Sequence, residues 1–311
     1  MKLSHSKLAT ILSCPMTYYL RYEAGMWQKV EKPALAIGSA VHWGIEHNTA
    51  DLSDFYKANG TFKQGDNYTR EQMLAEAMVQ AYLDKKEQLF AEMLTDPKTG
   101  EPMQLLDESH ELYLNAKFDG ADHKFVGIID LLLLTNKGFV LVDYKTSSLE
   151  PDWDGYLDQL YRYIFELRSN FPDTPIVKIA IVNIRKTGIR QKKSETPFEF
   201  EQRMVEEYRN PNNRLVVYHE FLPSDIEEQH IQDYIKNLQT MCDLAQNIVD
   251  NKLFFINYGA AKNQYGKSEF YDIFYRTPGA EALYAISDRV WNEDEQKFDD
   301  KRDCIKLDMQ I

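Results

Sequence analysis

The sequence predicts an α/β protein in which helices flank a central mixed β-sheet. Two apolar stretches joined by a turn, FVGIIDLLLLTNKGFVLVDYK at 125–145, indicate a buried pair of antiparallel strands. A helical stretch with an apolar stripe follows at 155–170, and a further apolar strand follows at 175–186. The order strand, strand, helix, strand is typical of a mixed sheet with helices packed against it.

The turn between the first two strands sets their register. Asn136 and Gly138 are residues that favour tight turns. With a short loop there, Asp130 lies directly across from Asp143, and alternation along the strand puts Lys145 on the same face as Asp143. Two facing carboxylates among apolar residues need a proton, a basic partner or a cation to neutralise them. With a lysine beside them, a divalent metal is the favoured interpretation.

The N-terminal part of the chain is predicted to be helical. Residues 4–23 begin with a serine cap and carry apolar residues at helical spacing, interrupted by Pro15. A second helix starts near Gly38 and places His42 and Glu46 four residues apart on one face. An isolated histidine on a helix, as His42 is when taken alone, is more often an ordinary half-buried residue than a metal ligand.

The stretch before the hairpin is predicted to be a helical insertion followed by a strand. The insertion covers about 51–100, and its long helix, 69–94, begins with a capping box. Residues 111–120 alternate as a strand does. Glu108 and Glu111 add a carboxylate to the site if this strand pairs beside Asp130, although each taken singly is more simply an edge-strand surface charge.

The stretch after the hairpin holds polar and basic candidates. The helix at 155–170 carries Gln159 and Tyr163 four residues apart, where they either border the core or face the site. Five cations gather at the end of the strand at 175–186 and in the loop after it. Most charge runs are solvated, but in a chain with a net charge of −13 this loop is the best candidate for a phosphate contact. The five cations are Arg185, Lys186, Arg190, Lys192 and Lys193.

The remaining features concern organisation and compartment. We expect one domain over 1–311, with an outer strand at 214–222 and a helical C-terminal part from about 223. Three widely spaced cysteines do not form a disulfide framework and suit a reducing cytoplasm. No signal sequence or membrane-spanning run is predicted. The acidic net charge argues against a general attraction to nucleic acid, so DNA contacts need local basic patches and bound cations.

Five short motifs, taken in order, resemble the PD-(D/E)XK nuclease superfamily and, more narrowly, its RecB-type and Cas4-like exonuclease branch. A single D-x-K triplet is common by chance, whereas the ordered set is specific. The motifs are SHSKLATILSCPMTYYL at 4–20, GSAVH ending at His42, GIID ending at Asp130, DYKT from Asp143, and QLYRY from Gln159 to Tyr163.

The resemblance implies a restriction-endonuclease-like core and a divalent metal held by His42, Asp130 and Asp143, with the Tyr144 carbonyl as a further ligand. Oxygen ligands suit Mg²⁺, and an imidazole among them favours Mn²⁺.

The resemblance also implies roles for three residues beside the metal. Lys145 positions or activates the attacking water and stabilises charge on the phosphate. Beside two carboxylates it should remain cationic, so electrostatic stabilisation is the better role than general base. Gln159 and Tyr163 line the substrate path and orient Lys145 or the DNA backbone.

One departure from the family pattern concerns iron and sulfur. Many members of this branch hold a 4Fe–4S cluster on one cysteine near the N-terminus and three near the C-terminus. Cys14 matches the first, but residues 257–277 contain no cysteine, and the other two cysteines are poorly placed. We therefore predict no iron–sulfur cluster, with Phe270, Tyr271 and Phe274 packing this region instead.

The function predicted from these features is a Mg²⁺- or Mn²⁺-dependent DNA exonuclease of recombination, repair or replication. The absence of a helicase motif suits an enzyme of a phage or mobile element, acting alone or with a host or phage partner. The alternatives are a structure-specific endonuclease, a catalytically inactive nucleic-acid-binding or assembly subunit, and a structural protein stabilised by metal.

Overall fold

The chain forms two compact units in the computed structural model. Unit 1 comprises Met1–Val30, Asn115–Val126 and Ile235–Ile311, and unit 2 comprises Glu31–Leu114 and Gly127–Tyr234. The structure describes residues 2–29, 33–59, 69–118, 124–149, 153, 156–263, 266–286, 289–292 and 297–300. The expectation of a single domain over the whole chain stays a prediction.

The helices agree with the predicted ones in type, but the helix predicted to start near Gly38 begins five residues earlier, at Pro33, a residue type that fits the first turn of a helix. Ser4 caps the first helix by accepting a hydrogen bond from the Lys7 N–H, and Thr69 forms the predicted capping box with Gln72. None of the helices among the described residues is both long and apolar enough to span a lipid bilayer. The helices are α1 (His5–Ser13), α2 (Pro15–Tyr18), α3 (Pro33–Glu46), α4 (Ser53–Asn59), α5 (Arg70–Met93), α6 (Leu157–Asn170), α7 (Pro197–Arg209), α8 (Glu228–Asp250) and α9 (Tyr271–Phe274), with a π-helical turn at Tyr19–Glu23 and 3-10 turns at Pro211–Asn213, Pro223–Asp225 and Ala280–Leu283.

Within the described part of the chain, the strands form one main sheet and three small two-stranded sheets. The longer strands are β3 (Leu105–Lys117), β4 (Lys124–Thr135), β5 (Gly138–Ser147), β6 (Ile176–Arg185) and β7 (Val216–Phe221). The shorter strands are β1 (Lys2–Ser4), β2 (Met26–Gln28), β8 (Lys262–Asn263), β9 (Gly266–Lys267), β10 (Tyr284–Ile286), β11 (Arg289–Asn292) and β12 (Lys297–Asp300).

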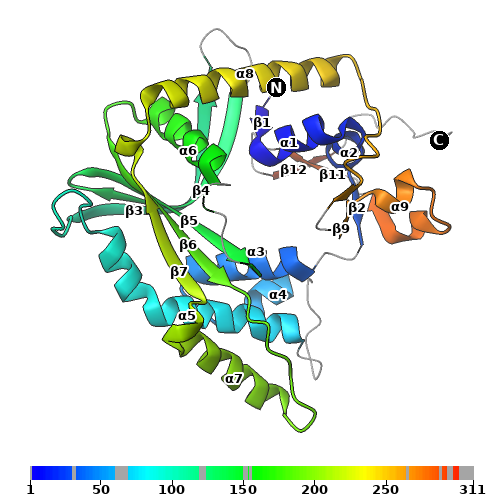
Figure 1. Ribbon diagram of the computed structural model, residues 1–311. Helices are drawn as coiled ribbons and strands as arrows, with labels where there is room; N and C mark the ends of the chain where they lie inside the picture. Colours follow the sequence, from blue (N-terminus) through cyan, green and yellow to red (C-terminus); the bar gives the residue numbers. More distant parts are fainter. Residues whose placement is uncertain are drawn as a thin grey trace. The chain divides into compact units, whose positions relative to one another are not determined.

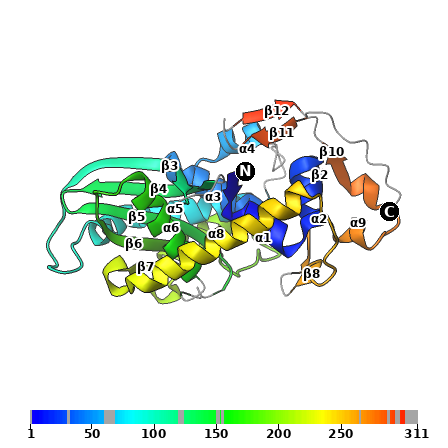
Figure 2. The same cartoon turned by 90° about the horizontal axis from the view of Figure 1, so that it is seen from above.

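The main sheet is mixed, as predicted. Strand β5 pairs antiparallel with β4 and parallel with β6, while β6 pairs antiparallel with β7 and β3 pairs with β4. The strands from β3 to β7 lie side by side in this order in Figure 2. The parallel neighbours β5 and β6 are connected through α6, which is the α/β order expected from the sequence. The prediction of a central mixed sheet flanked by helices is confirmed.

The hairpin has the predicted register. Asn136 and Lys137 form a two-residue loop between the paired residues Thr135 and Gly138, and the ladder runs to the pair Leu131–Val142. Gly138 has a φ of +129°, and a Cβ there would lie 2.2 Å from the carbonyl oxygen of Pro175, so only glycine fits this end of the turn. The register therefore places Asp130 and Asp143 at the position directly after the ladder ends.

Helices cover both faces of the sheet in unit 2. Tyr144 of β5 donates or accepts a hydrogen bond with Tyr82 of α5, at 2.9 Å, whereas its neighbour Asp143 accepts one from Gln159 of α6. Neighbouring residues of a strand point to opposite faces, so α5 covers one face and α6 the other. Figure 1 shows α3 and α5 along one side of β5, β6 and β7, and α6 along the other.

The close approach of α6 to β4 explains the glycine of the G-x-x-D motif. Glu166 of α6 is fully buried, and burial raises its pKa to about 7, while Arg162 lies 3.6 Å away. A Cβ on Gly127 would lie 2.2 Å from Glu166 Oε1. The side chain of residue 127 must therefore be absent for this carboxyl group to fit.

Gly127→Ala is expected to lower the free energy of unfolding by about 1–3 kcal/mol, because it forces extra atoms into a packed interior. Urea unfolding followed by circular dichroism measures the change. Gly188→Ala is the control, since a Cβ at Gly188 meets no atom within 4 Å. Equal losses in the two variants would contradict this account of Gly127.

Unit 1 brings the N-terminal segment together with the later part of the chain. Strand β1 pairs in parallel with Lys124–Val126, and Cys14 Sγ lies 3.4 Å from the backbone nitrogen of Asn257. Cys14, Phe270 and Phe274 are buried in one apolar cluster, and Tyr271 packs against it. The predicted apolar packing is confirmed, and the lack of an iron–sulfur cluster stays a prediction. Cys242 is buried, and Cys304 lies outside the described residues.

Candidate active site

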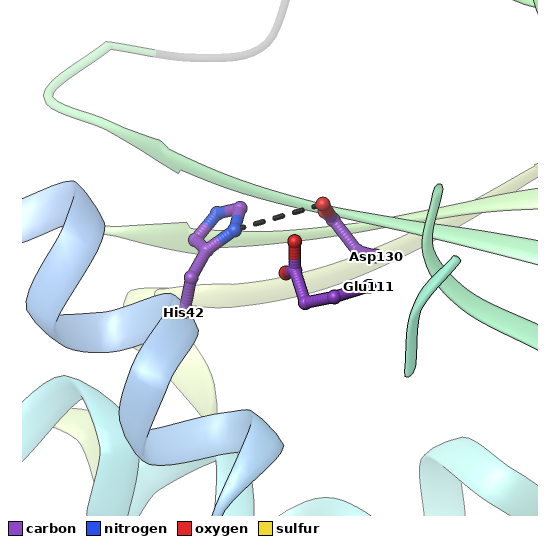
Figure 3. A group of neighbouring side chains, drawn as sticks. All are labelled: His42, Glu111 and Asp130. Atoms are coloured by element: carbon purple, nitrogen blue, oxygen red, sulfur yellow. Dashed lines mark ion pairs between the residues drawn. The ribbon is translucent and has the colours of Figure 1, made fainter. Parts of the chain in front are cut away.

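Three side chains from three elements of unit 2 converge at one point (Figure 3). His42 comes from α3, Glu111 from β3 and Asp130 from β4, and each offers a ligand atom within 4.8 Å of those of the other two. His42 Nδ1 lies 3.7 Å from Asp130 Oδ1. We call these residues the His42 group. The structure thus brings together two of the predicted metal ligands and adds Glu111.

The end of the β4–β5 ladder positions Asp130. Beyond the pair Leu131–Val142, Asp130 Oδ2 accepts a hydrogen bond of 2.7 Å from the backbone N–H of Tyr144. The carboxylate thereby accepts the hydrogen bond of a strand N–H that would otherwise pair with a backbone carbonyl group. One oxygen of Asp130 is held by the sheet, while the other points toward His42.

Backbone conformation distinguishes Glu111 from its neighbours in β3. Its φ is +48°, in the left-handed region that residues with a Cβ rarely adopt. Such a residue breaks the regular alternation of a strand and redirects its side chain. Strained residues of this kind gather at functional sites, where the surroundings hold them in place. The strain at Glu111 agrees with a functional position in the His42 group.

The charges of the His42 group are unbalanced. Burial raises the pKa of Asp130 to about 6, and the charge of Asp143 contributes to the rise. Glu111 stays partly exposed, yet loss of hydration raises its pKa to about 7, with further contributions from Asp130 and Glu46. Each carboxylate therefore holds its proton more tightly than in water. A divalent cation between them would remove this repulsion.

The second predicted carboxylate, Asp143, lies at the centre of a network of donors. Lys145 Nζ lies 2.7 Å from Asp143 Oδ2, and Gln159 Nε2 donates to Asp143 Oδ1 at 2.7 Å. The Tyr163 hydroxyl also donates to Asp143 Oδ1. Burial and the charge of Asp143 raise the pKa of Tyr163 well above its usual value, so the hydroxyl keeps its proton. We call these four residues the Asp143 network.

The Asp143 network shows where the predicted residues lie relative to one another. Asp143 is almost fully buried, whereas the side chain of Lys145 is 28% exposed and can reach a substrate. Gln159 and Tyr163 contact Asp143 directly, and they hold the carboxylate that in turn holds Lys145. Asp143 lies outside the His42 group, although its charge acts on Asp130.

The predicted basic residues fall into two sets. Arg185 and Lys186 line a cavity of about 720 Å³, together with Arg70 from the start of α5. Burial lowers the pKa of Lys186. By contrast, the other three cations occupy an exposed turn and do not line this cavity. They are Arg190, Lys192 and Lys193.

Glu111 is the residue of the His42 group whose place in the site the sequence left open. Its strand was predicted, but a surface role was the simpler interpretation for one glutamate of an edge strand. The available signal was its position in the strand before the hairpin, because such a strand can pair beside Asp130. Glu108, the other candidate, lies within 4.0 Å of His110 instead.

The donor set fits a divalent cation. Two carboxylates and an imidazole from separate elements offer oxygen and nitrogen atoms close enough to share one ion. Hard oxygen donors suit Mg²⁺ and Mn²⁺, and an imidazole shifts the preference toward Mn²⁺. The elevated pKa of each carboxyl group is the expected property of a site that gains a cation.

Comparisons with known proteins add a family and distant structural likenesses. The family model described as the PD-(D/E)XK nuclease superfamily matches residues 2–254. No curated protein matches the chain. The crystal structure of a "Putative exonuclease" from Eubacterium rectale has 14% identity, covers 79% of this chain and 82% of its own, and has a TM-score of 0.49. The structure of SSO0001 has 12% identity, covers 69% and 78%, and has a TM-score of 0.25. Likenesses this distant carry no weight in assigning a function.

Proposed function

Because this chain belongs to the PD-(D/E)XK nuclease superfamily, we propose that it is a metal-dependent DNA nuclease that acts as an exonuclease. One observation carries the proposal: the donors of the His42 group suit a cation, and the charge of Lys145, a partly exposed lysine held by Asp143, acts on Asp130 of that group. Hydrolysis of a phosphodiester needs both a cation and a fixed positive charge near the phosphate, and these two sets of residues supply them.

In this proposal His42, Glu111 and Asp130 hold Mg²⁺ or Mn²⁺, and Asp143 together with the Tyr144 carbonyl are the further ligands expected from the family pattern. A bound divalent cation supplies Lewis-acid chemistry and neutralises the carboxylates. Asp130 has one oxygen free for this role, because the Tyr144 N–H occupies the other.

Lys145 supplies the fixed positive charge. Its ammonium group stabilises the negative charge that develops on the phosphate oxygens, and it orients the attacking water. Gln159 and Tyr163 act as positioning residues, since both donate hydrogen bonds to Asp143, the carboxylate that holds Lys145. A side chain held in one place acts with less loss of entropy than a mobile one.

Basic residues beyond the centre are proposed to hold the DNA backbone. Arg185 is the last residue of β6 and Lys186 follows it directly, and both line the 720 Å³ cavity with Arg70. Lys145 of the neighbouring strand β5 pairs in register with Asn183 of β6, so the cavity lies within a few residues of the centre along the sheet. Arg190, Lys192 and Lys193 would extend this surface on the exposed turn.

Charge reversal of Arg190, Lys192 and Lys193 together is expected to raise the apparent KM for DNA and to flatten its dependence on salt. Each lost phosphate contact should reduce the salt slope by about one. Initial rates at several salt concentrations measure both effects. Lys236→Glu, on the exposed side of α8, is the control. Unchanged kinetics in the triple variant would assign the turn to the solvated surface.

Two alternatives remain within the proposal. A structure-specific endonuclease would use the same residues on a different DNA geometry, and an inactive binding or assembly subunit would keep the fold alone. The complete Asp143 network favours an enzyme over the inactive subunit, because binding alone needs no lysine held by a carboxylate that two further side chains fix in place.

One experiment separates these functions. End-labelled linear DNA and closed circular DNA are incubated with the purified protein and Mg²⁺ or Mn²⁺, and the products are followed over time. Degradation of the linear DNA alone supports an exonuclease, and cutting of the circle supports an endonuclease. If neither DNA is cut with either metal, the nuclease proposal is wrong and the inactive subunit is the better reading.

The biological setting belongs to the same proposal. We infer a role in DNA recombination, repair or replication in the cytoplasm, with DNA as the substrate and a host or phage protein as a further partner. A gene carried by a phage or mobile element suits a nuclease without its own helicase motif.

A further inference from the structure

A row of aromatic side chains begins beside the catalytic lysine. Lys145 Nζ lies 5.9 Å from the ring centroid of Tyr156, and the Tyr156 ring lies 6.0 Å from that of Trp153. Trp153 stacks on His219 with centroids 4.4 Å apart and ring planes at 18°. His219 meets Phe221 edge to face at 4.6 Å. We call the four rings the aromatic row.

The aromatic row differs from core packing in its place and its exposure. His219 and Phe221 lie on β7, which is at the end of the strand order and pairs only with β6 among the described strands. Trp153 lies in the connection between β5 and α6. All four rings are half-buried, so each keeps part of its surface open to solvent. Large aromatic rings with open surface on an edge strand are suited to contact a ligand.

The chemistry of the row selects the kind of ligand. None of the four rings carries a permanent charge, and burial lowers the pKa of His219, so its imidazole is neutral at neutral pH. The row therefore offers π-faces without phosphate-binding cations. Flat aromatic ligands stack on such faces, and nucleic acid bases do so with little regard to their identity.

We propose that the aromatic row is a stacking platform for unpaired bases of the DNA strand whose phosphate lies beside Lys145. The proposal rests on the nuclease function argued above and adds the substrate class, a single-stranded segment next to the cleaved bond. In a duplex, neighbouring base pairs cover both faces of each base, so no base face is open for the aromatic row to stack on. An unpaired strand exposes its bases and can follow the row away from Lys145.

Binding in the absence of metal tests the platform without requiring cleavage. Fluorescein-labelled oligothymidylate and an abasic strand of the same length are titrated with the full chain in chelator at low salt. Fluorescence anisotropy gives the two Kd values. We expect the wild-type protein to bind the strand with bases roughly tenfold more tightly than the abasic strand, which is the size of effect that stacking of one base on an aromatic side chain typically has. Trp153→Ala and His219→Ala should each remove most of this preference.

The salt dependence distinguishes stacking from a phosphate contact. Trp153→Ala should leave the affinity for the abasic strand and the salt slope unchanged, because phosphate contacts set both. Trp153→Phe keeps an aromatic face and should restore most of the preference, which separates stacking from a loss of fold. Thermal unfolding of each variant is measured alongside.

His47→Ala is the matched control. His47 stacks on Trp43 with centroids 4.1 Å apart and planes at 17°, the same arrangement as in the Trp153–His219 pair. Trp43 lies on α3, and His47 lies in the turn directly after this helix. Removing it should leave the base preference intact. The platform is refuted if the wild-type protein does not prefer the strand with bases, or if His47→Ala and Trp153→Ala reduce the preference equally.

The nuclease function fails by a different result. Cleavage of the same oligothymidylate is assayed separately with Mn²⁺. Suppose that the wild-type protein cuts no DNA, but prefers the strand with bases, and that Trp153→Ala removes this preference. The nuclease proposal is then wrong, while the platform is supported as a site for single-stranded DNA. If it cuts DNA and shows no base preference, the platform alone is refuted.

Discussion

Lys145→Ala is expected to reduce the rate of DNA cleavage by at least about 10²–10³-fold, the usual effect of removing one group that stabilises charge in a transition state. Lys145 is the cationic side chain held against Asp143, and its Nζ lies 2.7 Å from Asp143 Oδ2. The expected loss falls on kcat, because a charge that develops only during the reaction contributes little to substrate binding.

Two companion variants make the result specific. Lys137→Ala removes an exposed lysine from the turn of the same hairpin and should leave cleavage unchanged. Lys145→Gln keeps a hydrogen-bond donor for Asp143, so it tests whether any loss in the alanine variant comes from an uncompensated buried carboxylate. Cleavage by Lys145→Ala at the wild-type rate would end the catalytic assignment, provided that thermal unfolding shows an intact fold.

Local patterns in the sequence were sufficient to predict much of the sheet. The turn chemistry at Asn136 and Gly138 gave the correct register, since a two-residue loop leaves no freedom in the pairing that follows. The capping box at Thr69 gave the correct start of α5. These features depend on neighbours within a few residues, which a single sequence displays directly.

Long-range pairing was beyond the reach of such patterns. The parallel pairing of β1 with β4 joins Lys2–Ser4 to Lys124–Val126. Neither segment carries a sequence pattern that predicts the other as its pairing partner. The strand at 105–117 also begins earlier than the predicted 111, because its first residues alternate weakly and include several charges. Short and irregular strands depend on tertiary partners for their stability.

The site shows the same division between local and long-range information. The ordered motifs directed attention to His42, Asp130, Asp143 and Lys145, and the structure brings these residues into two adjoining groups. It could not be inferred that Glu111 takes a left-handed conformation and joins His42, because backbone strain is imposed by the surrounding fold. Tertiary packing likewise decides which partner each predicted carboxylate contacts.

Asp130→Asn is expected to weaken Mn²⁺ binding by more than the roughly 10–100-fold typical of losing an outer-shell partner of a metal, and to abolish cleavage. Asp130 Oδ1 lies 3.7 Å from His42 Nδ1, and replacement of Asp130 removes a negative charge and an anionic oxygen from the His42 group. Asp143→Asn should also weaken binding, since the charge of Asp143 acts on Asp130. Isothermal titration calorimetry measures both affinities.

Comparison of two glutamates of β3 tests the composition of the site. Glu111→Gln should weaken Mn²⁺ binding, because Glu111 lies within the His42 group, whereas Glu108→Gln should not, because Glu108 lies outside it. Both replacements remove one negative charge from the same strand, so a general electrostatic effect would change the two affinities alike. Equal affinities in the two variants would exclude Glu111 as a ligand.

The pH dependence of Mn²⁺ binding gives an independent check on the same residues. Below their pKa values of about 6 and about 7, Asp130 and Glu111 are protonated in the metal-free protein, so the cation must displace protons. The affinity should therefore rise as the pH increases through this range and level off above it, with release of protons on binding. Asp130→Asn removes one of the titrating groups and should make the rise shallower. An affinity independent of pH between about 5 and 8 would mean that the cation binds elsewhere, because no cation can occupy these two carboxylates without competing with their protons.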